Sequence, residues 1–180
     1  MNYNNIEKGF TLVEVLVVIL LLGVLMGMAV PRFSGVREQA RVAAMKMNLH
    51  NVQIFIELFH QEFGYYAEDF YEDGYGCVFP GGEYDVKIGK LPTNPWTGKE
   101  MDPDEFNPQD YDDITDISNT SENGPNDIYG YDPGNIVYSV WDPPGSTYPT
   151  NYGLVGIDHS GASIRDFDAE GNAVIFVLHN

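Results

Sequence analysis

The chain has 180 residues with 27 acidic and 9 basic side chains, which gives a formal net charge of -18 at pH 7. Of these, 23 acidic and 4 basic side chains follow residue 60, so this part would repel phosphates and direct nucleic-acid binding is not expected. The single cysteine, Cys77, excludes an intrachain disulfide and a cysteine-rich zinc site.

An apolar run covers residues 10–30 and contains one charged residue, Glu14. About twenty such residues are enough to cross the ~30 Å hydrocarbon core of a membrane as a helix. A cleaved secretory signal is one alternative, but its apolar region normally spans only ~7–15 residues after a basic flank, and here Glu7 and Lys8 cancel. A plain single-pass anchor explains the length of the run and not Glu14, unless that carboxylate stays hydrated near the membrane surface.

The residues around this carboxylate form a more specific motif. Residues 8–14 read Lys-Gly-Phe-Thr-Leu-Val-Glu and lead directly into the apolar run. This segment resembles the processing site of type IV pilins and of the pseudopilins of type II secretion, in which a prepilin peptidase cuts after a glycine and N-methylates the new amino terminus. The resemblance implies cleavage after Gly9, methylation of Phe10, and for Glu14 the role of the family's buried glutamate. It also implies that Pro31 kinks or loosens the helix.

Partners and location follow from the same resemblance. Before assembly, the apolar helix would hold the subunit in the inner membrane as a single pass. After cleavage, pilus or secretion machinery would polymerise identical subunits into an extracellular or periplasmic filament. Glu14 would then set the assembly register by facing the methylated amine of Phe10 on a neighbouring subunit, because an unpaired buried carboxylate is costly.

Beyond Pro31 the helical pattern becomes amphipathic and continues to Phe63, ahead of the stop signal Gly64. Two apolar rows recur at helical spacing, and we expect them to form one widening face that packs under a sheet. The first row, interrupted by Asn51, consists of Val36, Ala40, Ala43, Met47, Ile54 and Leu58. The second row consists of Val52, Ile56, Phe59 and Phe63.

The segment that follows the helix is aromatic, then rich in turn residues, then acidic. Residues 64–84 are crowded with tyrosine and phenylalanine, which indicates a packed loop over the helix rather than an aromatic path for stacking or electron transfer. Residues 91–98 read Leu-Pro-Thr-Asn-Pro-Trp-Thr-Gly, which predicts an ordered turn similar to a segment of many pilins and major pseudopilins. Residues 100–127 are acidic with few apolar positions, which predicts a long exposed loop.

Four short β-rich runs separated by turns complete the chain, at residues 136–141, 152–158, 162–167 and 173–178. They predict a small antiparallel sheet of three or four strands in a meander. The fold class is therefore α+β and pilin-like, with one long N-terminal helix packed on this sheet. The expected organisation is a leader (1–9), a transmembrane and filament-core helix (10–31), an amphipathic helix (32–63) and a globular head with the acidic loop and the sheet (64–180).

The chain contains no nucleophile, phosphate-loop, dinucleotide or zinc motif, so we do not expect an enzyme. Calcium is the one cofactor that the sequence suggests. Residues 166–171 match the first half of an EF-hand loop through Asp166 and Asp168, but Val177 stands where the bidentate glutamate is expected. The major pseudopilins that the chain resembles tie a carboxy-terminal loop with calcium, and Asp158 would join such a site. Solvated hairpin acids are the simpler interpretation, and a second acidic group is formed by Asp110, Asp112, Asp113 and Asp116.

Three functions remain open at this point. A major pilin of a type IV pilus would serve adhesion, twitching motility or DNA uptake, and a major pseudopilin would act in a type II secretion system. The missing disulfide and the turn at 91–98 fit both, and the long acidic, tyrosine-rich insertion favours the pilin. A single-pass membrane-anchored binding module is the third hypothesis, and it predicts an uncut amino terminus.

Overall fold

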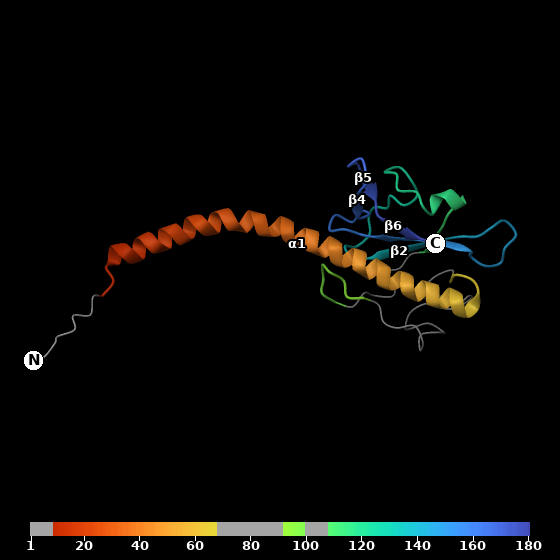
Figure 1. Cartoon of the computed structure of the whole chain (residues 1–180), viewed down its shortest axis with the longest axis horizontal. Coiled ribbons are helices and arrows are strands. Elements are labelled where there is room, and N and C mark those ends of the chain that lie inside the picture. The colour runs from red at the N-terminus through yellow and green to blue at the C-terminus, as the bar shows by residue number, and fades with distance from the viewer. Residues whose placement is uncertain (1–8, 68–91, 100–107) are drawn as a thin grey trace, which may run out of the picture. The chain divides into compact units, whose positions relative to one another are not determined.

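The computed structural model of the chain describes residues 9–67, 92–99 and 108–180. The chain divides into two compact units, Met1–Ala40 and Arg41–Asn180, which we call the N-terminal unit and the head unit. The boundary lies within one helix, α1 (Leu12–Phe63), which contributes residues to both units (Figure 1).

The long helix predicted for residues 10–63 is confirmed as α1, which has 52 residues. It continues through Pro31, so this proline does not end the helix, and the predicted kink stays a prediction. The helix ends where the sequence places its stop signal. Gly64 has a φ of +83°, a left-handed conformation that favours glycine, and its N–H donates to the carbonyl of His60 at 2.8 Å.

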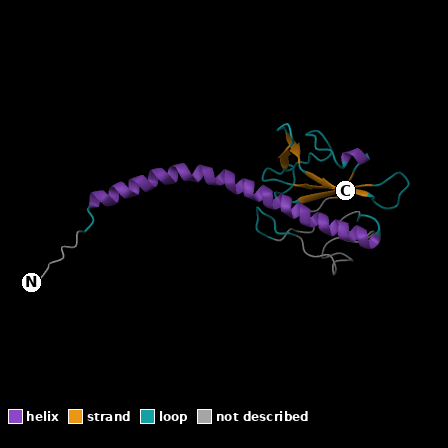
Figure 2. Ribbon diagram, in the orientation of Figure 1, coloured by secondary structure: helices purple, strands orange, loops and turns teal. Residues whose placement is uncertain are grey.

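Two small sheets lie in the head unit (Figure 2). The elements after α1 in the described residues are β1 (Pro108–Asp110), the 3-10 helix η2 (Ile114–Asp116), β2 (Ile136–Trp141), β3 (Asn151–Gly156), β4 (Arg165–Phe167), β5 (Ala173–Ile175) and β6 (Val177–His179). The larger sheet has the order β1-β2-β3-β6, in which β2, β3 and β6 are antiparallel and β1 joins β2 in parallel. The predicted α+β class is confirmed.

The smaller sheet corrects the predicted meander. The run at residues 173–178 is not one strand, because β5 pairs with β4 in a separate hairpin while β6 pairs with β3. The break falls at Phe176, whose N–H donates to the carbonyl of Ile164 at 2.9 Å. Its ring lies 4.6 Å from Nζ of Lys46 and packs against the main core. This side chain is therefore held toward α1, and the chain changes sheets at that residue.

The core of the head unit forms between α1 and the larger sheet. The helix contributes five side chains that are fully buried, namely Met45, Leu49, Val52, Ile56 and Phe59. From the sheet, Tyr138 and Tyr152 are the largest side chains with no exposure. The second predicted apolar row thus lies in the core, where it is joined by Met45 and Leu49.

The first predicted row does not pack under the sheet, so the prediction of one widening face is wrong. Met47, Ile54 and Leu58 are 62%, 56% and 47% exposed. At 3.6 residues per turn these positions lie about half a turn around the helix from the buried ones. Both rows have helical periodicity, and the periodicity alone does not tell which row meets the sheet.

The turn predicted for residues 91–98 is confirmed over its described residues, 92–98. Asn94 is only 4% exposed and organises the turn, since its Oδ1 accepts the N–H groups of Trp96 at 2.9 Å and Thr97 at 3.2 Å. Its Nδ2 donates to the carbonyl of Pro133 at 2.8 Å. This turn is thereby fixed to the segment that precedes β2.

Of the aromatic segment, only residues 64–67 are described, and Cys77 lies outside the described residues. Tyr65 stacks on Tyr148 with ring centroids 4.3 Å apart, and Tyr66 stacks on His60 at the same separation. These contacts agree with packing of the segment against the helix end.

The predicted acidic loop is more ordered than its composition indicates over its described part, which starts at residue 108. It contains β1 and η2, and it folds around Asn126, which is fully buried. Asn126 accepts the hydroxyl of Tyr111 at 2.6 Å and donates from Nδ2 to the carbonyl of Asn119 at 2.9 Å. Short-range bonds of this kind replace the regular ladders that the composition disfavours.

Candidate functional site

The predicted cleavage site lies at the entrance of α1. Gly9 and Phe10 precede the helix without regular secondary structure, and both are exposed, Phe10 to 88%. A Cβ added at Gly9 would meet no atom within 4 Å among the described residues. Within the described part of the chain, the peptide bond between Gly9 and Phe10 is therefore exposed, as a bond presented to a protease must be. The remainder of the predicted leader, residues 1–8, lies outside the described residues.

Glu14 has a structural partner that the sequence interpretation missed. Its Oε2 accepts the backbone N–H and the hydroxyl of Thr11, both at 2.8 Å, and its own N–H donates to Thr11 Oγ1 at 3.3 Å. This reciprocal arrangement is a capping box, in which the residue before the helix and the third helical residue satisfy each other's free N–H groups. The Thr-x-x-Glu spacing at residues 11–14 is the signal that predicts it.

Apolar side chains project from the whole circumference of α1 after this cap. Every leucine, isoleucine and valine from Leu12 to Leu25 is at least 48% exposed within the single chain. Among the described residues, no helical stretch reaches the length and apolar character that a membrane crossing requires.

The three predicted calcium ligands are each engaged elsewhere. Asp166 pairs with Lys46 of α1 at 2.6 Å, and the hydrogen bond from Lys46 holds the pKa of this carboxyl below its usual value. Asp158 accepts the N–H of Ser160 at 2.7 Å. Asp168 accepts the N–H of Asn172 at 2.8 Å, and the bonds from Asn172 lower the pKa of Asp168.

These carboxylates close turns or bind a lysine, and the described residues contain no group of three or more acidic, histidine or cysteine side chains that could hold a metal ion. Two residues of the second acidic group are also engaged, because Asp113 accepts the backbone N–H of Thr115 at the start of η2 and Asp116 accepts the backbone N–H of Asp113. Calcium binding by either group therefore stays a prediction.

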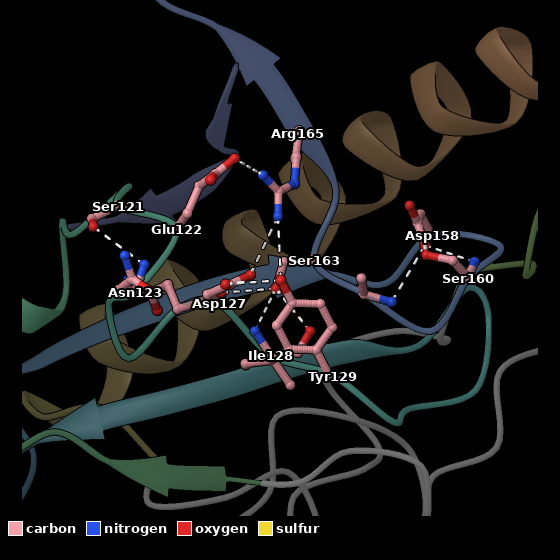
Figure 3. Close-up of polar contacts among 12 residues, drawn as sticks. Ser121, Glu122, Asn123, Asp127, Ile128, Tyr129, Asp158, Ser160, Ser163 and Arg165 are labelled. Carbon is pink, nitrogen blue, oxygen red and sulfur yellow. Dashed lines mark hydrogen bonds and ion pairs between the residues drawn. The ribbon is translucent and has the colours of Figure 1, made fainter. Parts of the chain in front are cut away.

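One charged cluster in the head unit was not predicted. Arg165, the last arginine of the chain, points to Glu122 on one side and to Asp127 and Tyr129 on the other (Figure 3). Its Nη2 lies 3.7 Å from Oδ1 of Asp127, and Tyr129 donates to Oδ2 of Asp127 at 2.9 Å. The Asp127 side chain is 7% exposed, so this guanidinium compensates a nearly buried carboxylate. The cluster fastens the segment before β2 to β4, and a lone arginine in an acidic region is the sequence signal for it.

Comparison with known proteins gives a match at the amino terminus. Residues 4–30 match the family model of the prokaryotic N-terminal methylation motif, which is the prepilin motif of type IV pilins and pseudopilins. No curated protein and no solved structure is similar enough to the chain to match it. The amino terminus is therefore of the prepilin type, and the motif is shared by pilins and pseudopilins alike.

Proposed function

We propose that the chain is a filament subunit of a type IV pilus, cut after Gly9, methylated at Phe10 and polymerised from the inner membrane. The observation that carries this proposal is the methylation motif at residues 4–30, placed at the entrance of a long helix whose apolar side chains are exposed on all sides. Such a helix requires an apolar environment, and a membrane before assembly and neighbouring helices afterwards would supply it in turn.

The roles of the N-terminal residues follow from this sequence of environments. In the precursor, residues 10–31 would hold the subunit in the membrane, and the exposed Gly9–Phe10 bond would reach the prepilin peptidase. After cleavage, the new amine at Phe10 and the carboxylate of Glu14 provide opposite charges within an apolar surface. A neighbouring subunit can pair these charges at one offset only, which would fix the register of the filament. No step of this cycle requires catalysis by the chain itself.

A major pseudopilin of a type II secretion system is the alternative, because the matched motif belongs to both kinds of subunit. The acidic head favours the pilus, since 23 acidic side chains against 4 basic ones after residue 60 give a highly charged, strongly hydrated surface. Deletion of the gene that encodes this chain distinguishes the two functions. Loss of surface filaments supports the pilus, whereas loss of secreted enzymes with filaments intact supports the pseudopilin.

Mass spectrometry of the mature chain tests the proposal. The expected amino terminus is N-methylated Phe10, and Gly9→Leu should leave the full precursor in the membrane because the peptidase requires a small residue. Gly23→Leu places the same side chain inside the apolar run, where no atom lies within 4 Å of an added Cβ, and should leave cleavage intact. An uncut chain in the wild type would favour a membrane-anchored binding module instead.

A further inference from the structure

The segment that precedes Asp127 in the head unit contains an exposed turn, at residues 121–124. The N–H of Gly124 donates to the carbonyl of Ser121 at 3.0 Å and closes the turn. The N–H of Asn123 donates to Oγ of Ser121 at 3.3 Å (Figure 3). Asn123 itself is exposed, so water reaches this part of the turn.

The pair Asn123-Gly124 has a reactivity that no other pair in the chain shares. Asn123 is the only asparagine of the 180-residue sequence that is followed by glycine. The backbone nitrogen that follows an asparagine can attack Cγ of that asparagine and close a succinimide ring. A Cβ on the following residue obstructs this approach, and glycine has none. The sequence therefore places one asparagine where the ring closure is unobstructed.

Packing explains why the second residue of this pair is glycine. A Cβ added at Gly124 would lie 2.6 Å from both Cγ and Oδ1 of Asn119, a distance that real Cβ atoms essentially never show. The Asn119 side chain is held in place, because its Oδ1 accepts the N–H of Ser121 at 2.9 Å. The Asn119 carbonyl also accepts Nδ2 of the buried Asn126 at 2.9 Å. A larger residue at position 124 would therefore disturb the turn, so the fold retains the reactive pair.

The closed turn slows the reaction that its sequence permits. The attacking nitrogen is that of Gly124, and its N–H is donated to Ser121 as long as the turn is closed. Glu122 pairs with Arg165 of β4 (Figure 3), and the N–H of Asp127 donates to the carbonyl of Gly124 at 3.0 Å. Ring closure therefore requires a local opening. Its rate is the rate in an open chain multiplied by the fraction of time that the turn is open.

We propose that Asn123 is a self-modification site at which the chain deamidates, and that the Glu122–Arg165 ion pair controls the rate. The backbone nitrogen of Gly124 forms a bond to Cγ of Asn123, the Cγ–Nδ2 bond breaks, and ammonia leaves with the proton of the Gly124 N–H. Water then adds to either carbonyl carbon of the succinimide and opens the ring, which gives aspartate or isoaspartate. In balance, a water is consumed and an ammonia is released, with no oxidant, cofactor or second protein.

Both products change the surroundings of Arg165. Each adds a carboxylate next to Glu122, in a part of the chain where acidic side chains already outnumber basic ones by 23 to 4. Isoaspartate also adds a carbon atom to the main chain inside the turn, which disfavours the closed turn. This modification concerns the head unit alone and applies whether or not the chain is a filament subunit.

Peptide mapping by mass spectrometry tests the site in the purified full chain. After incubation at neutral pH, the peptide that contains Asn123 should gain the mass difference between OH and NH2 and separate into two products. The isoaspartate product should be labelled by a protein isoaspartate methyltransferase. Asn172 is the internal control, because it is exposed and precedes alanine. Conversion at Asn123 that does not exceed conversion at Asn172 overturns the site.

Glutamine variants identify the reacting side chain. Asn123→Gln should abolish the conversion of this peptide, because glutamine must close a larger ring and reacts far more slowly. Asn172→Gln, the matched control, should leave conversion at Asn123 unchanged. An unchanged mass gain of the peptide in Asn123→Gln would place the reaction at another residue and overturn the proposal.

Glu122→Gln tests the rate control by the ion pair. The Glu122 side chain is 59% exposed, so the variant should fold while it loses its charge pairing with Arg165. Conversion at Asn123 in the folded chain should become roughly threefold faster, because the turn opens more often. Isolated peptides of residues 119–127 with either residue at position 122 should react at equal rates. An equal or slower rate in the folded variant overturns the control by the ion pair.

Discussion

The two halves of α1 both carry apolar side chains, and the chain leaves those of one half exposed while it buries many of those of the other. In the N-terminal unit the apolar side chains are exposed all around the helix, and none of those from Leu12 to Leu25 is buried by the chain. In the head unit, five side chains of the same helix are fully buried against the sheet. One continuous helix therefore combines a segment that packs against its own fold with a segment whose stability depends on its surroundings.

This contrast predicts two separable classes of variant. Substitutions in the N-terminal unit should change membrane insertion and assembly while the head unit keeps its stability. Substitutions in the head core should lower the free energy of unfolding. Both tryptophans, Trp96 and Trp141, lie in the head unit, so their fluorescence reports unfolding of that unit within the full chain.

The largest effect is expected at Glu14. Glu14→Val removes both the capping carboxylate and the charge that selects the register, and should abolish filaments or reduce them severely while cleavage after Gly9 continues. Filaments are counted by electron microscopy and cleavage is measured by mass spectrometry. Glu14→Gln keeps hydrogen bonding without charge and should be intermediate. Normal filaments from Glu14→Val would show that this carboxylate serves only the helix cap.

The next effect concerns the core side of the same helix. Phe59→Ala should lower the free energy of unfolding of the head unit by about 3–5 kcal/mol, because a fully buried aromatic ring is lost. Leu58→Ala is the matched control, since the neighbouring side chain is 47% exposed and its truncation should cost under about 1 kcal/mol. Denaturant unfolding followed by tryptophan fluorescence measures both, and equal losses would contradict the assignment of the two faces.

The sequence predicts much of this fold because its signals are local. The span of α1, the stop at Gly64, the strand at residues 136–141 and the turn around Asn94 each depend on neighbouring residues, and all are confirmed. Helical periodicity does not show which of two apolar rows packs against a sheet. The split at Phe176 is also non-local, because it depends on Lys46, which lies far away in the chain.

The candidate site also contains one part that the local sequence predicts and other parts that it does not. The processing motif is contiguous, and the family match at residues 4–30 supports it. The calcium prediction relied on spacing alone, whereas Asp166 is bound by a lysine from α1 that loop spacing does not include. The Arg165 cluster joins residues 36 and more positions apart, so its geometry could not be predicted from any local pattern.

A smaller effect should separate backbone strain from steric contact in the head unit. Gly134 and Gly145 both have positive φ, at +87° and +86°, but only a Cβ at Gly134 would meet another side chain, 2.3 Å from Oδ1 of Asn94. Gly145→Ala should cost about 1 kcal/mol from the left-handed backbone alone. Gly134→Ala should cost roughly 2–3 kcal/mol, because it also displaces the buried Asn94. Equal losses in denaturant unfolding would show that Asn94 does not hold this turn.

The smallest effect is a pH dependence of the link between α1 and β4. The hydrogen bond from Lys46 lowers the pKa of Asp166 below its ordinary value of 3.8, so folding favours the ionised carboxylate. The stabilisation is therefore complete above the unfolded pKa and is lost as the pH falls through the folded pKa.

Because the Asp166 side chain is 48% exposed, solvent screens its ion pair with Lys46, and we expect the pair to stabilise the fold by about 0.2–1 kcal/mol. The difference in unfolding free energy between the wild type and Asp166→Asn should thus be present at pH 7 and shrink as the pH falls below the unfolded pKa and then through the folded pKa of Asp166. High salt should reduce it at pH 7, and Asp112→Asn, which removes an exposed carboxylate elsewhere, should show no comparable loss. A difference that stays constant from pH 7 to pH 2 would mean that Asp166 acts through packing rather than through its charge.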